Sequence, residues 1–181
     1  GLDVPGERRG VGLRPATALD LPAMAALHAA NWRRDYAGLL PSVVLGGPLD
    51  DLMAALWTQQ ARRYHSCLVA RAADRVIGFA AFDPDKAGGL YLSSLHVAAQ
   101  ARGTGAGRAL MGAVAAIAGT NPLWLEVLCG NHPARGVYRR WGGAESAPFI
   151  DQMLGVQVES CRVTWGSGAA LAQALGAASL S

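Results

Sequence analysis

The sequence contains little charge, few cysteines and no long hydrophobic run. Only 16% of its 181 residues are charged whereas 51% are apolar, a balance typical of a folded globular domain and unlike that of a disordered chain. The three cysteines, Cys67, Cys129 and Cys161, are odd in number and widely spaced, which favours reduced thiols over a disulfide framework. No apolar run reaches about eighteen residues without a charge, so the sequence predicts no membrane span.

Clustered basic residues and a targeting segment are also lacking. The sixteen Lys and Arg residues are scattered, and with thirteen Asp and Glu residues they give a formal net charge of +3, whereas a nucleic-acid surface needs a clustered basic patch. Residues 1–10 lack the apolar core of a signal peptide and are expected to form a loose tail or a tag remnant. His, Cys and carboxylate residues show no metal-ligand spacing. We therefore predict a cytoplasmic protein that binds neither nucleic acid, membrane nor metal.

Hydrophobic periodicity, with glycine and proline as boundaries, divides the chain into strands and helices within one domain. Strands are predicted at about 11–15, 66–71, 76–82, 90–97, 123–128, 145–153 and 156–165. Helices are predicted at about 20–36, 50–63, 105–118 and 133–141. Residues 166–181 are small and Ala-rich and indicate a C-terminal tail or a poorly anchored helix. The chain contains no internal repeat or domain linker.

A glycine-rich loop within residues 100–111 joins the predicted strand 90–97 to the helix that follows it. Gly103, Gly105 and Gly107 alternate there, and glycine lets the backbone approach a ligand closely. The start of the next helix presents unpaired amides and a partial positive charge. Together these features predict a phosphate-binding site. A simple flexible turn is the alternative, because glycine supplies 23 of the 181 residues.

Two familiar phosphate-binding motifs fit this loop poorly. The Walker motif needs Lys followed by Ser or Thr after its last glycine, whereas Arg108 and Ala109 stand there. The dinucleotide fingerprint Gly-x-Gly-x-x-Gly is not matched, and the acidic residue that accompanies it belongs to an earlier strand of that fold. The loop therefore indicates neither of these nucleotide-binding folds.

Two separated motifs accompany the order of strand, glycine loop, helix, strand and helix. They read Gln100-x-x-Gly103-x-Gly105 and Asn131-x-x-Ala134-x-x-x-Tyr138-x-x-x-Gly142. Residues 11–165 resemble the GNAT superfamily of acyl-CoA-dependent N-acetyltransferases, both in these two motifs and in the order of their strands and helices. The segments Trp32-Arg-Arg-Asp-Tyr36 and Leu39-Leu40-Pro41 are similar to the first-helix region of many bacterial members. The resemblance implies an α/β (α+β) fold, with a mixed central sheet of about six to seven strands and about four flanking helices, and an acyl-CoA N-acyltransferase domain over 11–165.

The same resemblance implies how coenzyme A would bind. Main-chain amides of the loop would hold its pyrophosphate, the strand before the loop would meet the pantetheine arm through its backbone, and Asn131 would bond that arm. Tyr138 would stand near the sulfur. The residues implied are Leu95, His96, Val97, Arg102, Gly103, Thr104, Gly105, Ala106, Gly107, Asn131 and Tyr138. Two departures from the family pattern are Ala99, where many members carry proline, and Gly143, where an aromatic residue is common.

Glu126 and Tyr138 are the candidate catalytic residues. Glu126 lies in the apolar run 123–128, where an ionised carboxylate is costly unless it finds partners or water. The two residues are twelve positions apart, similar to bacterial ribosomal-protein N-terminal acetyltransferases, and this resemblance implies a general base and a general acid. A solvent-facing glutamate and a core tyrosine are the alternatives from the residues alone. His96 is a weaker catalytic candidate, and Cys129 has no visible base partner for acyl transfer.

By this resemblance we expect an N-acetyltransferase that moves an acetyl group directly from acetyl-CoA, its co-substrate, to a primary amine. The amine would belong to a small molecule or to a peptide or protein N-terminus. A non-catalytic acyl-CoA-binding or sensory module on the same fold is the alternative, and a domain that binds another nucleotide is a third. Trp32, Asp35 and Tyr36 either line the acceptor side, as the resemblance implies, or pack in the core. Both a monomer and a homodimer remain open.

Overall fold

The computed structural model describes residues 11–59 and 66–178. Within these residues eight strands form a single mixed sheet, of whose strand pairs only β4–β5 is parallel. The strand order is β1-β2-β3-β4-β5-β8-β6, and β7 also pairs with β8. The strands are β1 (Gly12–Pro15), β2 (Cys67–Ala72), β3 (Arg75–Lys86), β4 (Gly89–Val97), β5 (Leu123–Leu128), β6 (Ala144–Glu145), β7 (Phe149–Met153) and β8 (Val156–Trp165).

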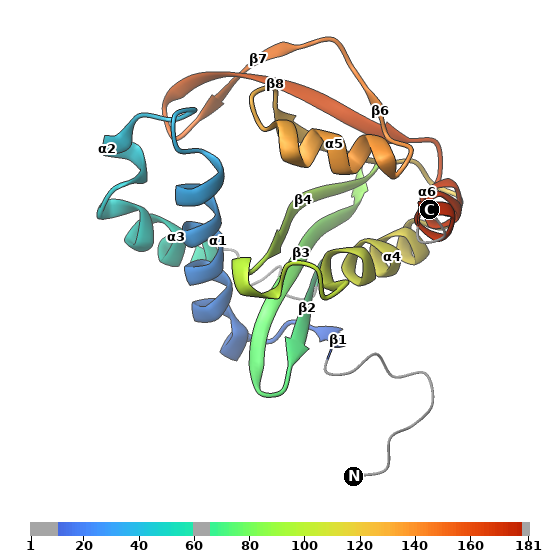
Figure 1. Ribbon diagram of the computed structural model, residues 1–181, viewed down its shortest axis with the longest axis horizontal. Helices are drawn as coiled ribbons and strands as arrows, with labels where there is room; N and C mark the ends of the chain where they lie inside the picture. The colour runs from blue at the N-terminus through green and yellow to red at the C-terminus, as the bar shows by residue number, and fades with distance from the viewer. Residues whose placement is uncertain (1–10, 60–65, 179–181) are drawn as a thin grey trace.

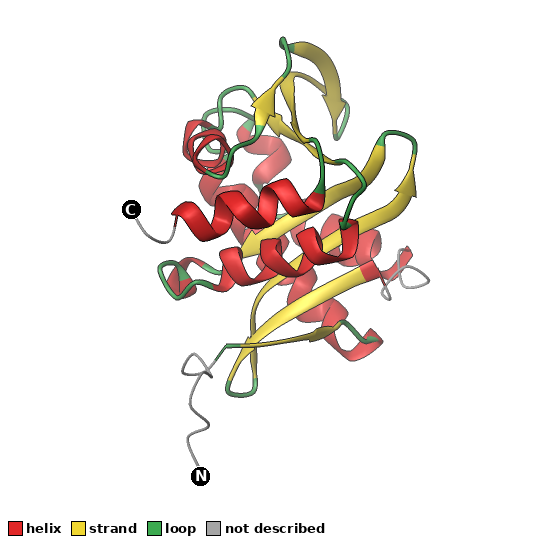
Figure 2. Cartoon of the chain, turned by 90° about the vertical axis from the view of Figure 1, so that its right-hand side faces the viewer, coloured by secondary structure: helices red, strands yellow, loops and turns green. Residues whose placement is uncertain are grey.

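Helices cover both faces of the sheet (Figure 1). They are α1 (Leu21–Asp35), α2 (Ser42–Leu45), α3 (Pro48–Gln59), α4 (Ala106–Ala118), α5 (His132–Arg140) and α6 (Gly168–Ala178). α1 and α3 pack together, with α1 against β3 and β4, while α4 and α6 lie side by side (Figure 2). In the two described ranges, no helix is both long enough and apolar enough to cross a membrane.

Neighbouring residues of β3 show how a helical layer is held on each face. Gly78 faces α4, because a Cβ there would come within 3.3 Å of Leu110 Cδ1. Phe79 faces the other layer, where its ring centroid lies 6.1 Å from that of His28 and 5.2 Å from that of Trp57. Phe79 and Leu110 are fully buried, and burying a side chain of this size stabilises a fold by about 1.5–3 kcal/mol. The sheet is therefore anchored to helices on both sides.

Most of the predicted elements are present, and the α/β fold is confirmed. β5 has the predicted bounds, Leu123–Leu128, and α4 begins directly after Gly105. The predicted strand 145–153 is instead divided into β6 and β7. The division falls at Ala147 and Pro148, because proline has no amide hydrogen to donate to a neighbouring strand. This division accounts for the eighth strand among the described residues.

Three further segments differ from the prediction. Residues 166–181, expected to be a tail or a poorly anchored helix, instead contribute α6, whose Leu171 and Leu175 are buried. β3 continues to Lys86 through a stretch expected to be a loop. The short helix α2 was not predicted. The expected tail at 1–10 and the expected end of the second helix at 60–63 lie outside the described residues.

β4 and β5 pair over two positions and then diverge. Leu90 and Tyr91 pair with Leu123 and Trp124, and no later residue of β4 pairs with β5 in the described part of the chain. β4 also carries a register shift at Ser93, whose Oγ donates to a carbonyl oxygen of β3 at 3.0 Å. Such an irregularity bends a strand locally. The carboxyl-terminal ends of β4 and β5 therefore lie apart.

Candidate active site

A cavity of about 620 Å³ lies where β4 and β5 diverge. β4 contributes Leu95 and His96 to its wall, and β5 contributes Leu125 and Glu126. Because consecutive side chains of a strand point to opposite faces of a sheet, a cavity lined by both members of each pair passes through the sheet. The end of α1 borders it on one face, and the glycine loop, α4 and α5 border it on the other.

The glycine loop borders the cavity with a backbone conformation that favours glycine. Gly103 and Gly105 have φ angles of +83° and +85°, in the left-handed region where other residues are strained. Gly107 approaches β4 closely, since a Cβ there would lie 3.4 Å from Val97 Cγ2. Within residues 11–59 and 66–178, the amides of Gly103, Gly105, Gly107 and Arg108 have no hydrogen-bond acceptor. The loop and helix start thus offer the group of unpaired N–H donors that a diphosphate needs.

The other predicted loop amides are engaged within the loop itself. The Arg102 amide donates to Ala99 O and the Thr104 amide to Ala101 O, both at 3.3 Å. The Ala106 amide donates to Thr104 Oγ1 at 3.4 Å, and that hydroxyl donates to Ala101 O at 2.6 Å. Thr104 therefore braces the loop, and it is the one predicted loop residue that does not line the cavity.

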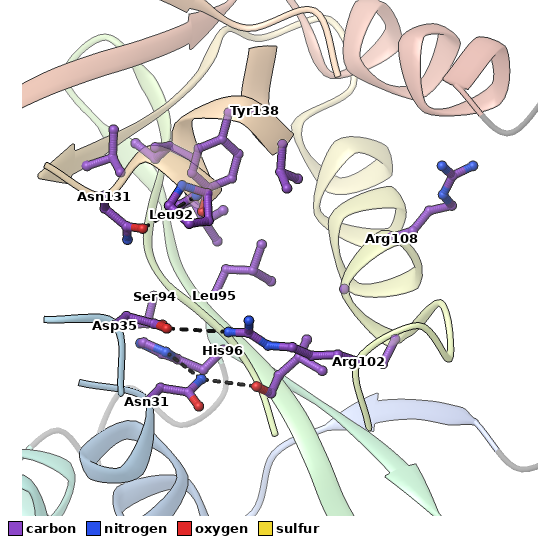
Figure 3. A pocket seen from close by; sticks show the side chains of 18 of the residues that line it. Asn31, Asp35, Leu92, Ser94, Leu95, His96, Arg102, Arg108, Asn131 and Tyr138 are labelled. Carbon is purple, nitrogen blue, oxygen red and sulfur yellow. Dashed lines mark hydrogen bonds and ion pairs between the residues drawn. The ribbon is translucent and has the colours of Figure 1, made fainter. Parts of the chain in front are cut away.

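The arginines on either side of the loop point in different directions (Figure 3). Arg102 reaches toward α1, where its Nη2 lies 3.5 Å from Asp35 Oδ1. Arg108 points away from the other labelled side chains, and its Nη1 donates to Leu175 O near the end of α6 at 3.1 Å. A cation is favourable at that end of a helix. Arg108 thus ties α6 to α4.

Asn131 and Tyr138 lie on the same side of the cavity, across from Asp35 and His96 (Figure 3). Asn131 is the N-cap of α5, and its Oδ1 accepts from the Ala134 amide at 3.4 Å. The Tyr138 ring packs edge-on against Trp165, with centroids 6.2 Å apart. Burial raises the pKa of Tyr138 above its ordinary value. In the described part of the chain, the Tyr138 hydroxyl has no hydrogen-bond partner.

The strand register assigns Glu126 to the face of the sheet that α1 covers. His96 contacts His28 of α1, with ring centroids 4.3 Å apart. Tyr91 lies on the same face as His96, because their partners on β3 are four residues apart and paired residues share a face. Trp124 stacks on Tyr91 with a centroid distance of 4.2 Å. Glu126 follows Trp124 by two residues on β5, so its side chain emerges on that same face.

Glu126 is neither buried nor without a partner. Its side chain is 26% exposed, so the expected burial within an apolar strand is not found. Arg162 lies directly opposite on β8, and its Nη2 donates to Glu126 Oε1 at 3.3 Å. The ion pair and the solvent together compensate the charge of this carboxylate, so it bears no large desolvation cost. Sequence reasoning missed Arg162, because a cross-strand neighbour 36 residues away is visible only from the register.

His96 and His28 form an imidazole pair between β4 and α1. Trp57 Nε1 donates to His28 Nδ1 at 3.1 Å, and Asn31 Nδ2 lies 3.2 Å from His96 Nδ1 (Figure 3). Burial lowers the pKa of His28 to about 4, and burial is also the main cause that lowers the pKa of His96 well below its usual value. Both rings are therefore neutral at pH 7. Asn31 recurs at helical spacing with the apolar Leu21, Met24 and Leu27 of its helix, which is the one sequence sign of a buried polar role.

The three predicted β4 residues, Leu95, His96 and Val97, all line the cavity. The Val97 carbonyl oxygen already accepts from Asn31 Nδ2 at 3.1 Å. After Tyr91, β4 has no partner on the β5 side in the described ranges. Apart from the Val97 carbonyl oxygen, backbone groups of β4 beyond Tyr91 are therefore free to meet a ligand from that side.

Two of the three α1 candidates border the cavity. Asp35 and Tyr36 line it, whereas Trp32 packs against the core. Burial, with a smaller effect of the Asp35 charge, raises the pKa of Tyr36 to about 12. Cys129 lies outside the cavity wall, and its Sγ is 3.0 Å from that of Cys161. No group of three or more metal-ligating side chains gathers in the part of the chain that the structure describes.

A comparison with protein families finds a match over most of the chain. Residues 27–143 match the model described as "Acetyltransferase (GNAT) family". The matched region includes most of α1, the glycine loop, Glu126 and α5. A search of the curated proteins finds no match.

Solved structures share the fold. A ribosomal-protein-alanine N-acetyltransferase from Brucella melitensis is 24% identical, with a TM-score of 0.62 over 85% of this chain and 98% of that one. A PaiA N-acetyltransferase from Thermoplasma acidophilum in complex with coenzyme A is 17% identical, with a TM-score of 0.66 over 86% and 99%. An N-acetyltransferase from Staphylococcus aureus Mu50 is 14% identical, with a TM-score of 0.65 over 85% and 100%. At these identities the likeness establishes the fold alone.

Proposed function

The chain belongs to the acetyltransferase (GNAT) family, and from this premise we propose that it transfers an acetyl group from acetyl-CoA to a primary amine. The observation that carries the proposal is the cavity through the sheet. It joins a wall with unpaired loop amides on one face to the Glu126 carboxylate on the other. A thioester and an amine could therefore approach one point from opposite faces.

The donor side fits the diphosphate of coenzyme A. The unpaired amides of Gly103, Gly105, Gly107 and Arg108 would hold it, aided by the positive end of the α4 dipole. Asn131 and the β4 backbone beyond Tyr91 would hold the pantetheine arm. The complex of the Thermoplasma acidophilum protein with coenzyme A supports this assignment by likeness of fold.

On the acceptor side, Glu126 would act as the general base, directly or through a water molecule. It takes a proton from the amine, whose nitrogen attacks the thioester carbonyl carbon. A main-chain amide of residues 95–97 stabilises the oxyanion. The carbon–sulfur bond then breaks as the new carbon–nitrogen bond is completed, and the Tyr138 hydroxyl gives its proton to the departing thiolate. Each step uses a residue of the cavity wall.

The raised pKa of Tyr138 is compatible with a role as acid. A phenol of pKa about 10 that protonates a thiolate of pKa about 8.5 faces an uphill step of roughly 2 kcal/mol, which is small beside a chemical barrier. Burial raises the pKa of Tyr138 further. The same desolvation also disfavours the thiolate charge and so raises the pKa of the thiol. The difference between the pKa values of phenol and thiol therefore changes less than either pKa value.

The ease of deprotonation favours an α-amine as acceptor. At pH 7, removing a proton from an α-amine of pKa about 8 costs about 1.4 kcal/mol, whereas a lysine-like amine of pKa about 10.4 costs about 4.6 kcal/mol. The Glu126 side chain is 26% exposed and paired with a guanidinium, so it does not by itself offset the larger cost of a lysine-like amine. We therefore propose peptide or protein N-termini and small α-amines as the first class to test.

Substitution of the two catalytic candidates tests this function. A panel of α-amines, lysine-like amines and short peptides is incubated with acetyl-CoA, and thiol release is followed. Glu126→Gln and Tyr138→Phe should each lower kcat by about 10²–10⁴-fold, while acetyl-CoA still raises the melting temperature by binding the folded state. Glu159→Gln, at an exposed position of β8, is the matched control and should retain full activity.

Other outcomes distinguish the competing functions. Unchanged turnover in both variants would remove the assigned catalytic roles. Stabilisation by acetyl-CoA without turnover of any amine would favour a binding or sensory module. Stabilisation by ATP or NAD, but not by acetyl-CoA, would favour a domain for another nucleotide.

A further inference from the structure

A row of stacked side chains crosses the sheet next to Glu126. Trp124 of β5 lies between the Tyr91 ring, at 4.2 Å between centroids and 29° between planes, and the Arg162 guanidinium, at 3.9 Å from its ring centroid. Lys86 Nζ lies 4.2 Å from the centroid of Tyr91. Because β5 lies between β4 and β8, Tyr91 and Arg162 approach Trp124 from opposite sides. Side chains from β3, β4, β5 and β8 thus form one continuous stack.

The centre of the stack is held in place by its surroundings. Trp124 is 5% exposed, and the β3–β4 turn passes close to its indole nitrogen at Gly88. Gly89 follows with a φ of +118°, and a Cβ there would collide with Pro122 O. Trp124 Nε1 is buried and has no partner among the described residues. Trp124 therefore contacts Tyr91 and Arg162 through the faces of its ring and not through its N–H.

Arg162 uses this ring as a support and Glu126 as its partner. A guanidinium over an indole face is attracted by the ring quadrupole, and the planar group keeps its N–H donors free at the edge. One of these donors makes the charge-assisted bond to Glu126 Oε1 at 3.3 Å. Glu126 lines the cavity, whereas Arg162 and Trp124 do not.

We infer that Arg162, held over the face of Trp124, is a positioning residue that orients the Glu126 carboxylate toward the cavity. It binds one carboxylate oxygen and leaves Oε2 without a protein partner in the described part of the chain. A base must be unprotonated to act, and an ion pair with a guanidinium requires the same form. An ion pair this exposed contributes little to stability, so its effect should appear in catalysis. The inference rests on the proposed role of Glu126.

A double-mutant cycle tests whether Arg162 acts through Glu126. The amine of the panel with the highest turnover is used as acceptor. Arg162→Gln should lower kcat by about 10-fold to 100-fold, as expected when a reacting group is misplaced, and should leave the KM for acetyl-CoA within about twofold. In the Glu126→Gln background, the same substitution should change kcat by less than about twofold. If the double variant instead lowers kcat by the product of the two single factors, the two residues act independently and the inference is overturned.

Two further variants separate positioning from general damage. Trp124→Leu removes the aromatic support and should lower kcat as Arg162→Gln does, whereas Trp124→Phe keeps a ring face and should lose less. Arg75→Gln, exposed at the start of β3, removes the same charge elsewhere and should be silent. A higher KM for the amine that persists in the Glu126→Gln background would mean that Arg162 contacts the acceptor itself, which contradicts a positioning role.

A crystal structure of Arg162→Gln with coenzyme A tests the inference without any acceptor. The Glu126 side chain should leave its present orientation, and an unmoved carboxylate would refute positioning by Arg162. If no amine is turned over by the unmodified protein, the proposed function fails, while this structural comparison still decides what Arg162 does to Glu126.

Discussion

Acidification from pH 7 to pH 5 should destabilise the fold through the His28–His96 pair. His28 is 5% exposed, and burial lowers its pKa from 6.5 to about 4. The unfolded chain regains the ordinary value, so between pH 6.5 and pH 4 it binds a proton that the folded chain does not. Proton linkage then gives a loss of about 2 kcal/mol in the free energy of unfolding between pH 7 and pH 5 from His28 alone. The pKa of His96 is shifted in the same direction and adds to the loss.

The paired carboxylates do not contribute in this pH window. Guanidinium partners lower the pKa of Asp20, Asp50 and Glu145 below their ordinary values of 3.8, 3.8 and 4.5. The stability that these pairs provide is present above those values and is lost only as the pH falls further. The loss between pH 7 and pH 5 therefore reports on the histidines.

Urea unfolding followed by tryptophan fluorescence at pH 7, 6 and 5 measures the effect by linear extrapolation. His28→Gln is the matched variant, because glutamine can accept from Trp57 Nε1 but does not titrate. The variant should lose about 2 kcal/mol less than the unmodified protein between pH 7 and pH 5. A loss below about 0.5 kcal/mol in the unmodified protein, or an equal loss in both, would refute the reasoning.

Replacing a glycine of the loop and a glycine of α4 by alanine should change the free energy of unfolding in opposite directions. Replacing a leucine of α6 tests how firmly that helix is attached. Gly105→Ala should destabilise by about 1–2 kcal/mol and raise the KM for acetyl-CoA, because Gly105 has a φ of +85°. Gly112→Ala in α4, where a Cβ meets nothing within 4 Å, should stabilise by about 0.5–1 kcal/mol. Urea denaturation measures both, and equal signs would contradict the loop conformation. Leu171→Ala should cost about 2–5 kcal/mol, because Leu171 is fully buried. A thermal and urea comparison showing a loss below about 0.5 kcal/mol would instead mean that α6 is loosely attached.

Elements with a strong local pattern could be predicted from the sequence, and elements without one could not. The run Leu123–Leu128 is apolar at every position except Glu126, which is typical of a buried strand. The break between β6 and β7 has one local sign, Pro148, in a run whose two halves both pair with the next strand, β8. α6 consists mainly of small residues, so its apolar stripe contrasts weakly with the rest of the helix.

The same division between local and distant information applies to the site. The glycine spacing and the Asn131–Tyr138 motif are local, and Gly103, Gly105, Gly107, Asn131, Ala134 and Tyr138 line the cavity. The environment of Glu126 depends on Arg162, which only the pairing of β5 with β8 brings close. The passage of the cavity through the sheet depends on where β4 and β5 stop pairing. No pattern within either strand contains that information.

The tight turn at Gly89 separates two kinds of evolutionary constraint. Any side chain there would collide with the Pro122 backbone, so every descendant that keeps this hairpin must keep glycine, whether or not it still converts a substrate. Arg162 is under no such demand, because its side chain is 47% exposed and a strand accommodates many residues at an open position. On the inferred role of Arg162, substitutions accepted at 162 but not at 89 would mark lineages that have kept the hairpin without the oriented carboxylate.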